Sequence, residues 1–197
     1  MIKLAMVRHG QTNFNLQRLV QGRIDNPLNE NGIEQAHLLA AHLKEQNKSF
    51  DAILSSPLSR ALETAWIVAQ TLNKTEPIEI VQHFVERDFH KLDGKDVEYA
   101  WPLIQQKDYS HPGYETDAKL VERVVKAAFK LVEKHDGKEL LCVAHSHVLK
   151  ALLVYSNPNK FTFTNYKLTN GDVIYFEVDK DSIKFIEHIK HIKHPKG

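Results

Sequence analysis

The stretch Ile2-Lys3-Leu4-Ala5-Met6-Val7 decides the fold, and it breaks off at the polar run Arg8-His9-Gly10. A short apolar run of this kind is typical of a strand buried inside a sheet. Comparable runs recur at 50–54, 77–84 and 139–144, and segments with helical spacing of apolar side chains lie between them. Strands that alternate with helices predict an α/β protein with a mostly parallel sheet covered on both faces.

The rest of the sequence supplies the helices and a final pair of strands. Helices are predicted to start at 29–32 and after Ser55-Ser56-Pro57, to span 97–106 and 117–134, and to follow Ala144. Residues 173–178 and 183–189 are predicted to pair as a hairpin. Neither an internal repeat nor a linker divides the chain, so we expect a single domain over residues 1–197.

The composition excludes several classes of protein. A chain of 197 residues suits one domain, and its net charge of +1 gives no general attraction to nucleic acid or to a membrane. No apolar run approaches membrane-spanning length, and the first strand starts at once without a signal peptide, so we expect a cytoplasmic protein. The single cysteine, Cys142, rules out an internal disulfide and is expected to be a small core residue.

Polar side chains follow the predicted strands at the points where they end. Ligands of parallel α/β sheets bind outside the carboxyl ends of the strands, which meet at one edge of the sheet. Groups from distant parts of the chain are therefore expected to converge there. These groups are Arg8 and His9 after the first strand, Ser55, Ser56 and Arg60 after the second, Glu86 after the third and His145 after the fourth.

This set of side chains suits phosphoryl transfer. Arg8 and Arg60 offer planar donor forks to phosphate oxygens, and a neutral His9 attacks phosphorus to give a phosphohistidine. His145 would donate to a phosphate oxygen, with its charge state left open. Glu86 would protonate the leaving alcohol and later activate water, if apolar neighbours such as Phe84 and Phe89 raise its pKa. The scheme needs neither a metal nor a cofactor.

Other chemistries fit the sequence less well. A cysteine phosphatase needs an arginine shortly after its nucleophile, and no arginine follows Cys142. Neither a P-loop nor a Gly-x-Ser-x-Gly pattern occurs. His145-Ser146-His147 resembles a pair of metal ligands, but a following helix would turn the two imidazoles apart. The histidines at 188, 191 and 194 allow a weak metal site, although a solvated terminal segment is the favoured interpretation.

Three motifs resemble those of the histidine phosphatase superfamily, the phosphoglycerate mutase-like proteins. They are Arg8-His9-Gly10-Gln11-Thr12-Asn13-Phe14-Asn15, then Gly22-Arg23-Ile24-Asp25-Asn26-Pro27-Leu28 with Gly32, Gln35 and Ala36, and the segment from Ser55 to Ala65. The resemblance covers nearly the whole chain. It implies a three-layer α/β/α sandwich, with a mostly parallel sheet and one antiparallel edge strand.

The resemblance also implies roles for single residues. His9 matches the phosphorylated nucleophile, and Arg8, Arg60 and His145 match the phosphate pocket. Asn15 matches an asparagine that contacts phosphate, and Gln21 and Gly22 match a stretch that touches substrate. Glu86 matches the proton donor, with Glu98 and Glu115 as alternatives in the same variable region. The chain departs from the family at His90 and Ser146, where glycine is frequent, but the backbone N–H of Ser146 can still bind phosphate.

Residues 87–115 are predicted to form a lid that reads the leaving group. The lid contains aromatic and basic side chains that suit a phosphorylated sugar, a nucleotide-like compound or a small acid, namely Lys91, Lys95, Tyr99, Trp101, Lys107, Tyr109 and His111. It looks too short for a cofactor-dependent mutase, so a phosphatase is favoured over a mutase or a non-catalytic phospho-ligand binder. The expected partner is a small phosphorylated metabolite, and a homodimer stays open.

Overall fold

A single six-stranded sheet forms the centre of the molecule, described by a computed structural model for residues 1–106 and 108–190. The strand order is β3-β2-β4-β1-β5-β6. Parallel pairing joins β3, β2, β4 and β1, whereas β5 pairs antiparallel with both β1 and β6, so that the last two strands form an antiparallel edge. The strands are β1 (Ile2–Arg8), β2 (Ala52–Ser55), β3 (Glu79–Ile80), β4 (Glu139–Ala144), β5 (Val173–Val178) and β6 (Ile183–Ile189).

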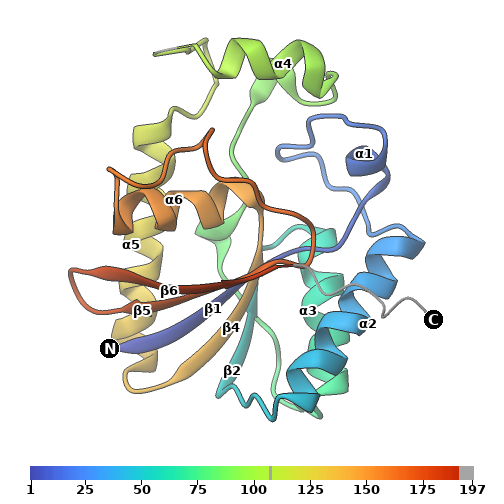
Figure 1. Ribbon diagram of the computed structural model, residues 1–197, viewed down its shortest axis with the longest axis vertical. Helices are drawn as coiled ribbons and strands as arrows, with labels where there is room; N and C mark the ends of the chain where they lie inside the picture. Colours follow the sequence, from blue (N-terminus) through green and yellow to red (C-terminus); the bar gives the residue numbers. More distant parts are fainter. Residues whose placement is uncertain (107, 191–197) are drawn as a thin grey trace.

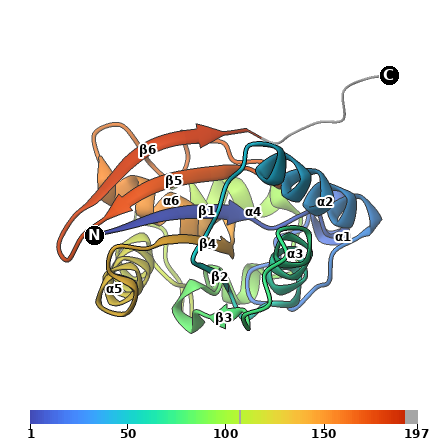
Figure 2. The ribbon, with the colours of Figure 1, turned by 90° about the horizontal axis from the view of Figure 1, so that it is seen from below.

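Helices cover both faces of this sheet and complete the predicted three-layer α/β/α sandwich. One face carries α2 (Glu30–Glu45) and α3 (Ser59–Thr71), and the other carries α5 (Asp117–His135) and α6 (Ser146–Ser156) (Figures 1 and 2). The short α1 (Asn13–Leu16) and α4 (Val97–Ile104) lie beyond the strand ends, at the top of Figure 1. Two 3₁₀ turns, Gln82–Phe84 and His90–Leu92, connect β3 to α4.

The apolar character of β1 follows from its place in the sheet. Ile2, Leu4 and Met6 pack in the core beneath α5 and α6, whereas Ala5 and Val7 pack beneath α2 and α3. Because successive side chains of a strand point to opposite faces, a strand covered on both faces is apolar at nearly every position. The chain becomes polar at Arg8 and His9, where the strand leaves the core and reaches the edge that holds the site.

The third strand is shorter than predicted from residues 77–84. Only Glu79 and Ile80 pair with β2, after which the chain turns away as a 3₁₀ helix. The turn carries Phe84 into the core, where it is fully buried. The apolar run therefore forms first a short edge strand and then a turn that buries Phe84 in the core. Glu86 follows this turn and does not follow the strand directly.

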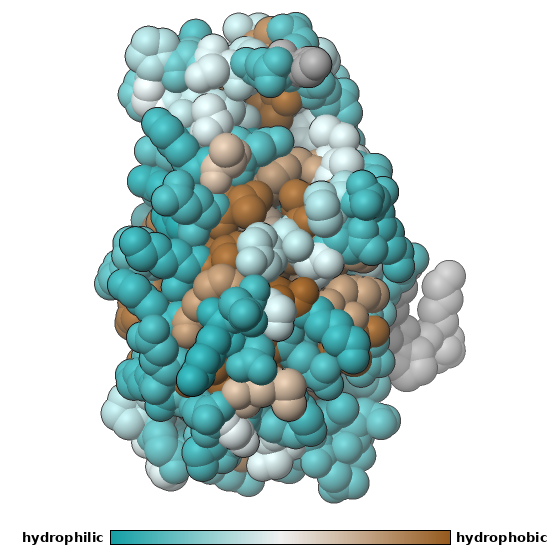
Figure 3. Space-filling view, turned by 90° about the vertical axis from the view of Figure 1, so that its left-hand side faces the viewer, coloured by the Kyte–Doolittle hydropathy of each residue, from teal (hydrophilic) through white to brown (hydrophobic). Residues whose placement is uncertain are grey.

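The described helices include none that is long and apolar enough to cross a membrane. The face on the left of Figure 1 carries mainly hydrophilic side chains with apolar ones between them (Figure 3). Cys142 is a fully buried core residue of β4, as expected, and burial raises the pKa of its thiol.

Candidate active site

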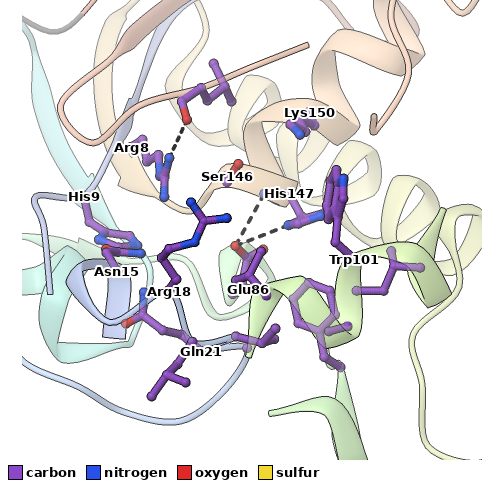
Figure 4. A pocket seen from close by; sticks show the side chains of 18 of the residues that line it. Arg8, His9, Asn15, Arg18, Gln21, Glu86, Trp101, Ser146, His147 and Lys150 are labelled. Atoms are coloured by element: carbon purple, nitrogen blue, oxygen red, sulfur yellow. Dashed lines mark hydrogen bonds and ion pairs between the residues drawn. The ribbon is translucent and has the colours of Figure 1, made fainter. Parts of the chain in front are cut away.

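A cavity of about 430 Å³ opens at the carboxyl ends of β1 and β4 (Figure 4). Its volume suits a small metabolite. Eight of the nine residues predicted for the site line it, and the ninth, His145, lies directly behind His9. The eight are Arg8, His9, Asn15, Gln21, Gly22, Arg60, Glu86 and Ser146.

His9 presents an unprotonated nitrogen to the site. Its Nδ1 lies 2.7 Å from the carbonyl oxygen of Gly10, and because a carbonyl only accepts, Nδ1 carries the proton. Its Nε2 accepts a hydrogen bond of 3.2 Å from Nε of Arg60. Burial and the positive charges of Arg60 and Arg8, with His145 nearby, hold the pKa of His9 well below its usual value. The imidazole is therefore neutral at neutral pH, as a nucleophile requires.

Gly10 fixes the backbone of the nucleophile against the start of α2. A Cβ at Gly10 would lie 2.4 Å from the carbonyl oxygen of Gly32, so no larger residue fits. The N–H of Gly10 donates to the Thr64 hydroxyl on α3 at 3.1 Å. This close approach explains why glycine occurs at both positions of the motif.

Arg60 is held in place by backbone carbonyls. Its Nη1 donates to Ile24 at 2.8 Å and its Nη2 to Gly22 at 2.9 Å, and the side chain is only 1% exposed. Burial lowers the pKa of Arg60 to about 10, so the guanidinium stays charged at neutral pH. Arg8 enters from β1, where one of its Nη atoms donates to the carbonyl of Leu168 and its buried Nε has no partner among the described residues.

His145, at the end of β4, contacts residues that follow both β2 and β1. Its Nε2 lies 2.6 Å from the Ser56 hydroxyl, and its ring centroid lies 5.1 Å from that of His9. Burial, reinforced by Arg60 and Arg8, holds the pKa of His145 well below its usual value, which makes its ring neutral without substrate. Its Nδ1 is buried and has no hydrogen-bond partner in the described structure.

Glu86 lines the cavity, but its predicted raised pKa is wrong. Burial does act to raise the pKa, yet His147, His145 and the backbone N–H of Arg87 outweigh it and hold the pKa well below the usual value. Oε1 accepts from the N–H of Arg87 at 2.8 Å, and Oε2 accepts from the N–H of His147 at 3.4 Å. The carboxyl is therefore ionised at neutral pH before substrate binds.

The alternative acids lie elsewhere. Glu115 forms an ion pair of 2.7 Å with Arg123 and accepts from the N–H of Asp88, and the side chain of Glu98 is 80% exposed. Neither lines the cavity.

Asn15, Gln21 and Ser146 complete the wall beside His9. Asn15 Oδ1 accepts from Asn170 Nδ2 at 3.1 Å and from the N–H of Thr12 at 3.2 Å, which directs the Asn15 amide NH₂ to other partners. Gln21 Oε1 accepts from the Thr12 hydroxyl at 2.7 Å. Ser146 is the first residue of α6, where N–H groups point out of the helix and favour an anion.

Two cations of the cavity, Arg18 and Lys150, were not predicted. Arg18 has a left-handed backbone, with φ of 58°, just after α1. Lys150 lies one helical turn after Ser146 on α6, and this i, i+4 spacing is the only sequence signal that points to it.

Of the basic and aromatic residues predicted for the lid, Trp101 lines the cavity, whereas Tyr99 is 60% exposed. Lys107 lies outside the described residues.

Among the described residues, the histidines considered as metal ligands have separate partners. His145 and His147 turn to different partners, Ser56 and Glu86. His188 is not solvated as predicted, because it lies 3.0 Å from Asp172 and 2.8 Å from the Tyr166 hydroxyl. The histidines at 191 and 194 lie outside the described residues. Within 1–106 and 108–190, no group of three or more side chains could hold a metal ion.

The chain is similar to known proteins along most of its length. Residues 4–189 match the family model of the histidine phosphatase superfamily, branch 1. The chain is 35% identical over 93% of both chains to an uncharacterised phosphatase, PhoE, of Bacillus subtilis, and 34% identical to a metal-independent phosphoserine phosphatase of Arabidopsis thaliana, over 76% of this chain and 66% of that one. The solved structure of Bacillus stearothermophilus YhfR superposes with a TM-score of 0.83 at 28% identity, covering 94% of this chain and 95% of that chain. The chain belongs to the histidine phosphatase superfamily.

Proposed function

We propose that this protein is a phosphatase that hydrolyses small phosphomonoesters through a phosphohistidine at His9. The observation that carries the proposal is the hydrogen bond from Arg60 Nε to the unprotonated Nε2 of His9. This hydrogen bond supports the proposal because it brings the cation of Arg60 next to the nitrogen that we propose attacks phosphorus. The phosphatase names of the relatives from Bacillus subtilis and Arabidopsis support the same activity.

In the first step, the Nε–H of Arg60 moves from His9 Nε2 to a phosphate oxygen, which frees the lone pair of Nε2 to bond to phosphorus while the bond to the alcohol oxygen breaks. Arg8, Arg60 and His145 stabilise the charge on the non-bridging oxygens. A bound phosphate dianion repels the Glu86 carboxylate and raises its pKa, which allows Glu86 to carry the proton that the leaving oxygen needs. The reaction needs one proton, and this proton can enter the site either on Glu86 or on the ester.

In the second step, water replaces the alcohol. Glu86, ionised again, takes a proton from water as the water oxygen attacks phosphorus, and the bond from phosphorus to His9 Nε2 breaks. Inorganic phosphate leaves, and His9 returns to its neutral form. The ester, water, His9 and Glu86 together supply every proton and electron pair in the two steps, so the scheme needs no metal.

A panel of phosphorylated metabolites, with p-nitrophenyl phosphate as reference, tests the proposal. Phosphoserine belongs in the panel because the Arabidopsis relative bears that name. We expect turnover that EDTA leaves unchanged and that the His9→Ala variant lacks. Transfer between 2- and 3-phosphoglycerate without hydrolysis would instead establish a mutase. Tight binding without any phosphoenzyme would establish a non-catalytic binder.

The proposed partner is thus a small phosphorylated metabolite, and neither nucleic acid nor a membrane takes part in the scheme.

A further inference from the structure

Lys150 is a buried cation in the wall of the cavity. It is only 6% exposed, and its Nζ donates to the carbonyl oxygen of Phe163 at 2.7 Å. Burying an ammonium group is costly unless it is paired with an anion. Figure 4 shows Lys150 on the far side of the cavity from His9, above Trp101.

The described structure gives this ammonium little compensation. Among the described residues, Nζ has one further close contact beyond the bond to Phe163, a cation–π contact with the ring of Trp101, whose centroid lies 5.8 Å away. The carboxylate of Glu86 is engaged by the N–H groups of Arg87 and His147. Burial and the repulsion of Arg8 and Arg87 lower the pKa of Lys150 to about 8, although Glu86 acts against them. An ammonium has three donors, so Lys150 retains donors for a ligand.

The cavity wall carries more positive charge than the phosphate group of a simple ester can compensate. Its described wall carries four cations, Arg8, Arg18, Arg60 and Lys150, against the single carboxylate of Glu86. Its two histidines, His9 and His147, both have lowered pKa values and are neutral at neutral pH. With Glu86 ionised, a phosphate dianion compensates two of three excess positive charges, and with Glu86 protonated it compensates two of four. At least one positive charge therefore remains for another part of the substrate.

Arg18 adds a second cation on the substrate side of the cavity. Figure 4 shows its guanidinium extending into the middle of the cavity, between Arg8 and Glu86. Among the described residues Arg18 forms an ion pair with Glu98, at 3.6 Å, and because both side chains are largely exposed, this pair contributes little to stability. A left-handed backbone at a residue other than glycine is strained, and strain of this kind clusters at functional sites.

We propose that the natural substrate carries a carboxylate on its leaving group, and that Lys150 binds this carboxylate while His9 attacks the phosphorus. The substrate class is therefore a phosphorylated hydroxy acid or hydroxy amino acid. This inference rests on the proposed phosphatase function. Lys150 acts as a specificity-determining residue, with Trp101 shielding the ion pair from water.

Two substrates with the same three-carbon skeleton test the inference. 3-Phosphoglycerate has a carboxylate at the carbon where glycerol 3-phosphate has a hydroxymethyl group. We expect the wild-type protein to favour 3-phosphoglycerate in kcat/KM by about tenfold or more, as the pairing of a buried charge implies. The Lys150→Met variant should lose this preference, mainly through KM. Lys150→Gln keeps a donor for Phe163 and should lose it too, whereas Lys150→Arg keeps the charge and should retain part of it.

The controls separate this inference from the proposed function. Lys126→Met removes an exposed charge on α5 and should leave the preference unchanged. Hydrolysis of p-nitrophenyl phosphate without preference for the carboxylate would overturn the role of Lys150 but leave the phosphatase function intact. An unchanged preference in folded Lys150→Met or Lys150→Gln would overturn it as well. Failure to hydrolyse any ester, p-nitrophenyl phosphate included, would defeat the proposed function itself.

Discussion

Arg60 Nε donates to His9 Nε2 at 3.2 Å, so a cation lies against the nitrogen proposed to attack phosphorus. The other two donors used by the guanidinium are fixed on the carbonyls of Gly22 and Ile24. The orientation of Arg60 therefore depends on the loop that follows Gln21, and the electrostatics of the nucleophile depend on Arg60.

Replacing Arg60 by lysine keeps the charge but removes the planar fork. An ammonium cannot hold both carbonyls and still donate to His9 and phosphate, so the transferring group loses a fixed donor. We expect kcat/KM for p-nitrophenyl phosphate to fall about 10²- to 10³-fold. Steady-state kinetics measure the loss, and a thermal unfolding scan checks that Arg60→Lys is folded. Activity within threefold of wild type would contradict the role given to the fork.

Gly22 is predicted to be required for the same reason. Its φ is +49°, and a Cβ there would lie 1.9 Å from Oδ1 of Asp93. Gly22→Ala should displace the carbonyl that holds Arg60 and lower kcat/KM on the order of tenfold to 100-fold. Gly137→Ala is the matched control, because Gly137 also has a positive φ (+76°) but open space around it. The control should lower the free energy of unfolding by about 1–2 kcal/mol and leave activity unchanged. Equal kinetic effects in both variants would refute the argument.

Glu86→Gln should affect substrates according to their leaving groups. An alkyl alcohol needs a proton to leave, so hydrolysis of alkyl phosphates should fall about 10²- to 10⁴-fold. p-Nitrophenolate leaves without a proton, but water still needs a base to attack the phosphoenzyme. Stopped-flow with p-nitrophenyl phosphate should therefore show a burst of p-nitrophenolate followed by slow turnover. Equal loss for both classes of ester, without a burst, would mean that Glu86 is not the proton donor.

His147 is predicted to set the pKa of Glu86. Its ring nitrogen Nδ1 lies 3.7 Å from Glu86 Oε2, and it is the first of the groups that lower the pKa of this carboxyl against burial. His147→Phe removes the ring donor but keeps the backbone N–H, so the pKa of Glu86 should rise. Ionised Glu86 with the ester monoanion holds the same number of protons as protonated Glu86 with the ester dianion, so both describe one reactive complex. Below the pKa of Glu86 this complex takes up an additional proton, and activity falls. The acidic limb of kcat/KM should therefore move to higher pH, and an unmoved limb would show that other donors control Glu86.

The fold and the centre of the site follow from the sequence because both depend on strands. In β1, apolar side chains at successive positions predict a strand covered on both faces, and the polar residues after it must lie at the edge of the sheet. The same argument brings Arg60 and His145 to His9, although they are far away in the chain.

The outer wall of the site could not be predicted in this way. Arg18 lines the cavity because of an irregular turn after α1, and Lys150 lines it because of the face that α6 turns toward the cavity. The pKa of Glu86 depends on donors from His147, which is 61 residues away along the chain. Apolar neighbours in the sequence gave the opposite prediction, because they reveal burial but not the hydrogen bonds that compensate for it.

Rapid-quench analysis with a ³²P-labelled phosphomonoester decides whether His9 carries the phosphoryl group. We expect a phosphoprotein that forms within the first turnover, is labile in acid and stable in alkali, and yields a labelled peptide containing His9. With ³²P-labelled p-nitrophenyl phosphate, whose leaving group needs no proton, Glu86→Gln should accumulate this phosphoprotein, and His9→Ala should not form it at all while remaining folded. Turnover without such an intermediate, or label on a residue other than His9, would contradict the account.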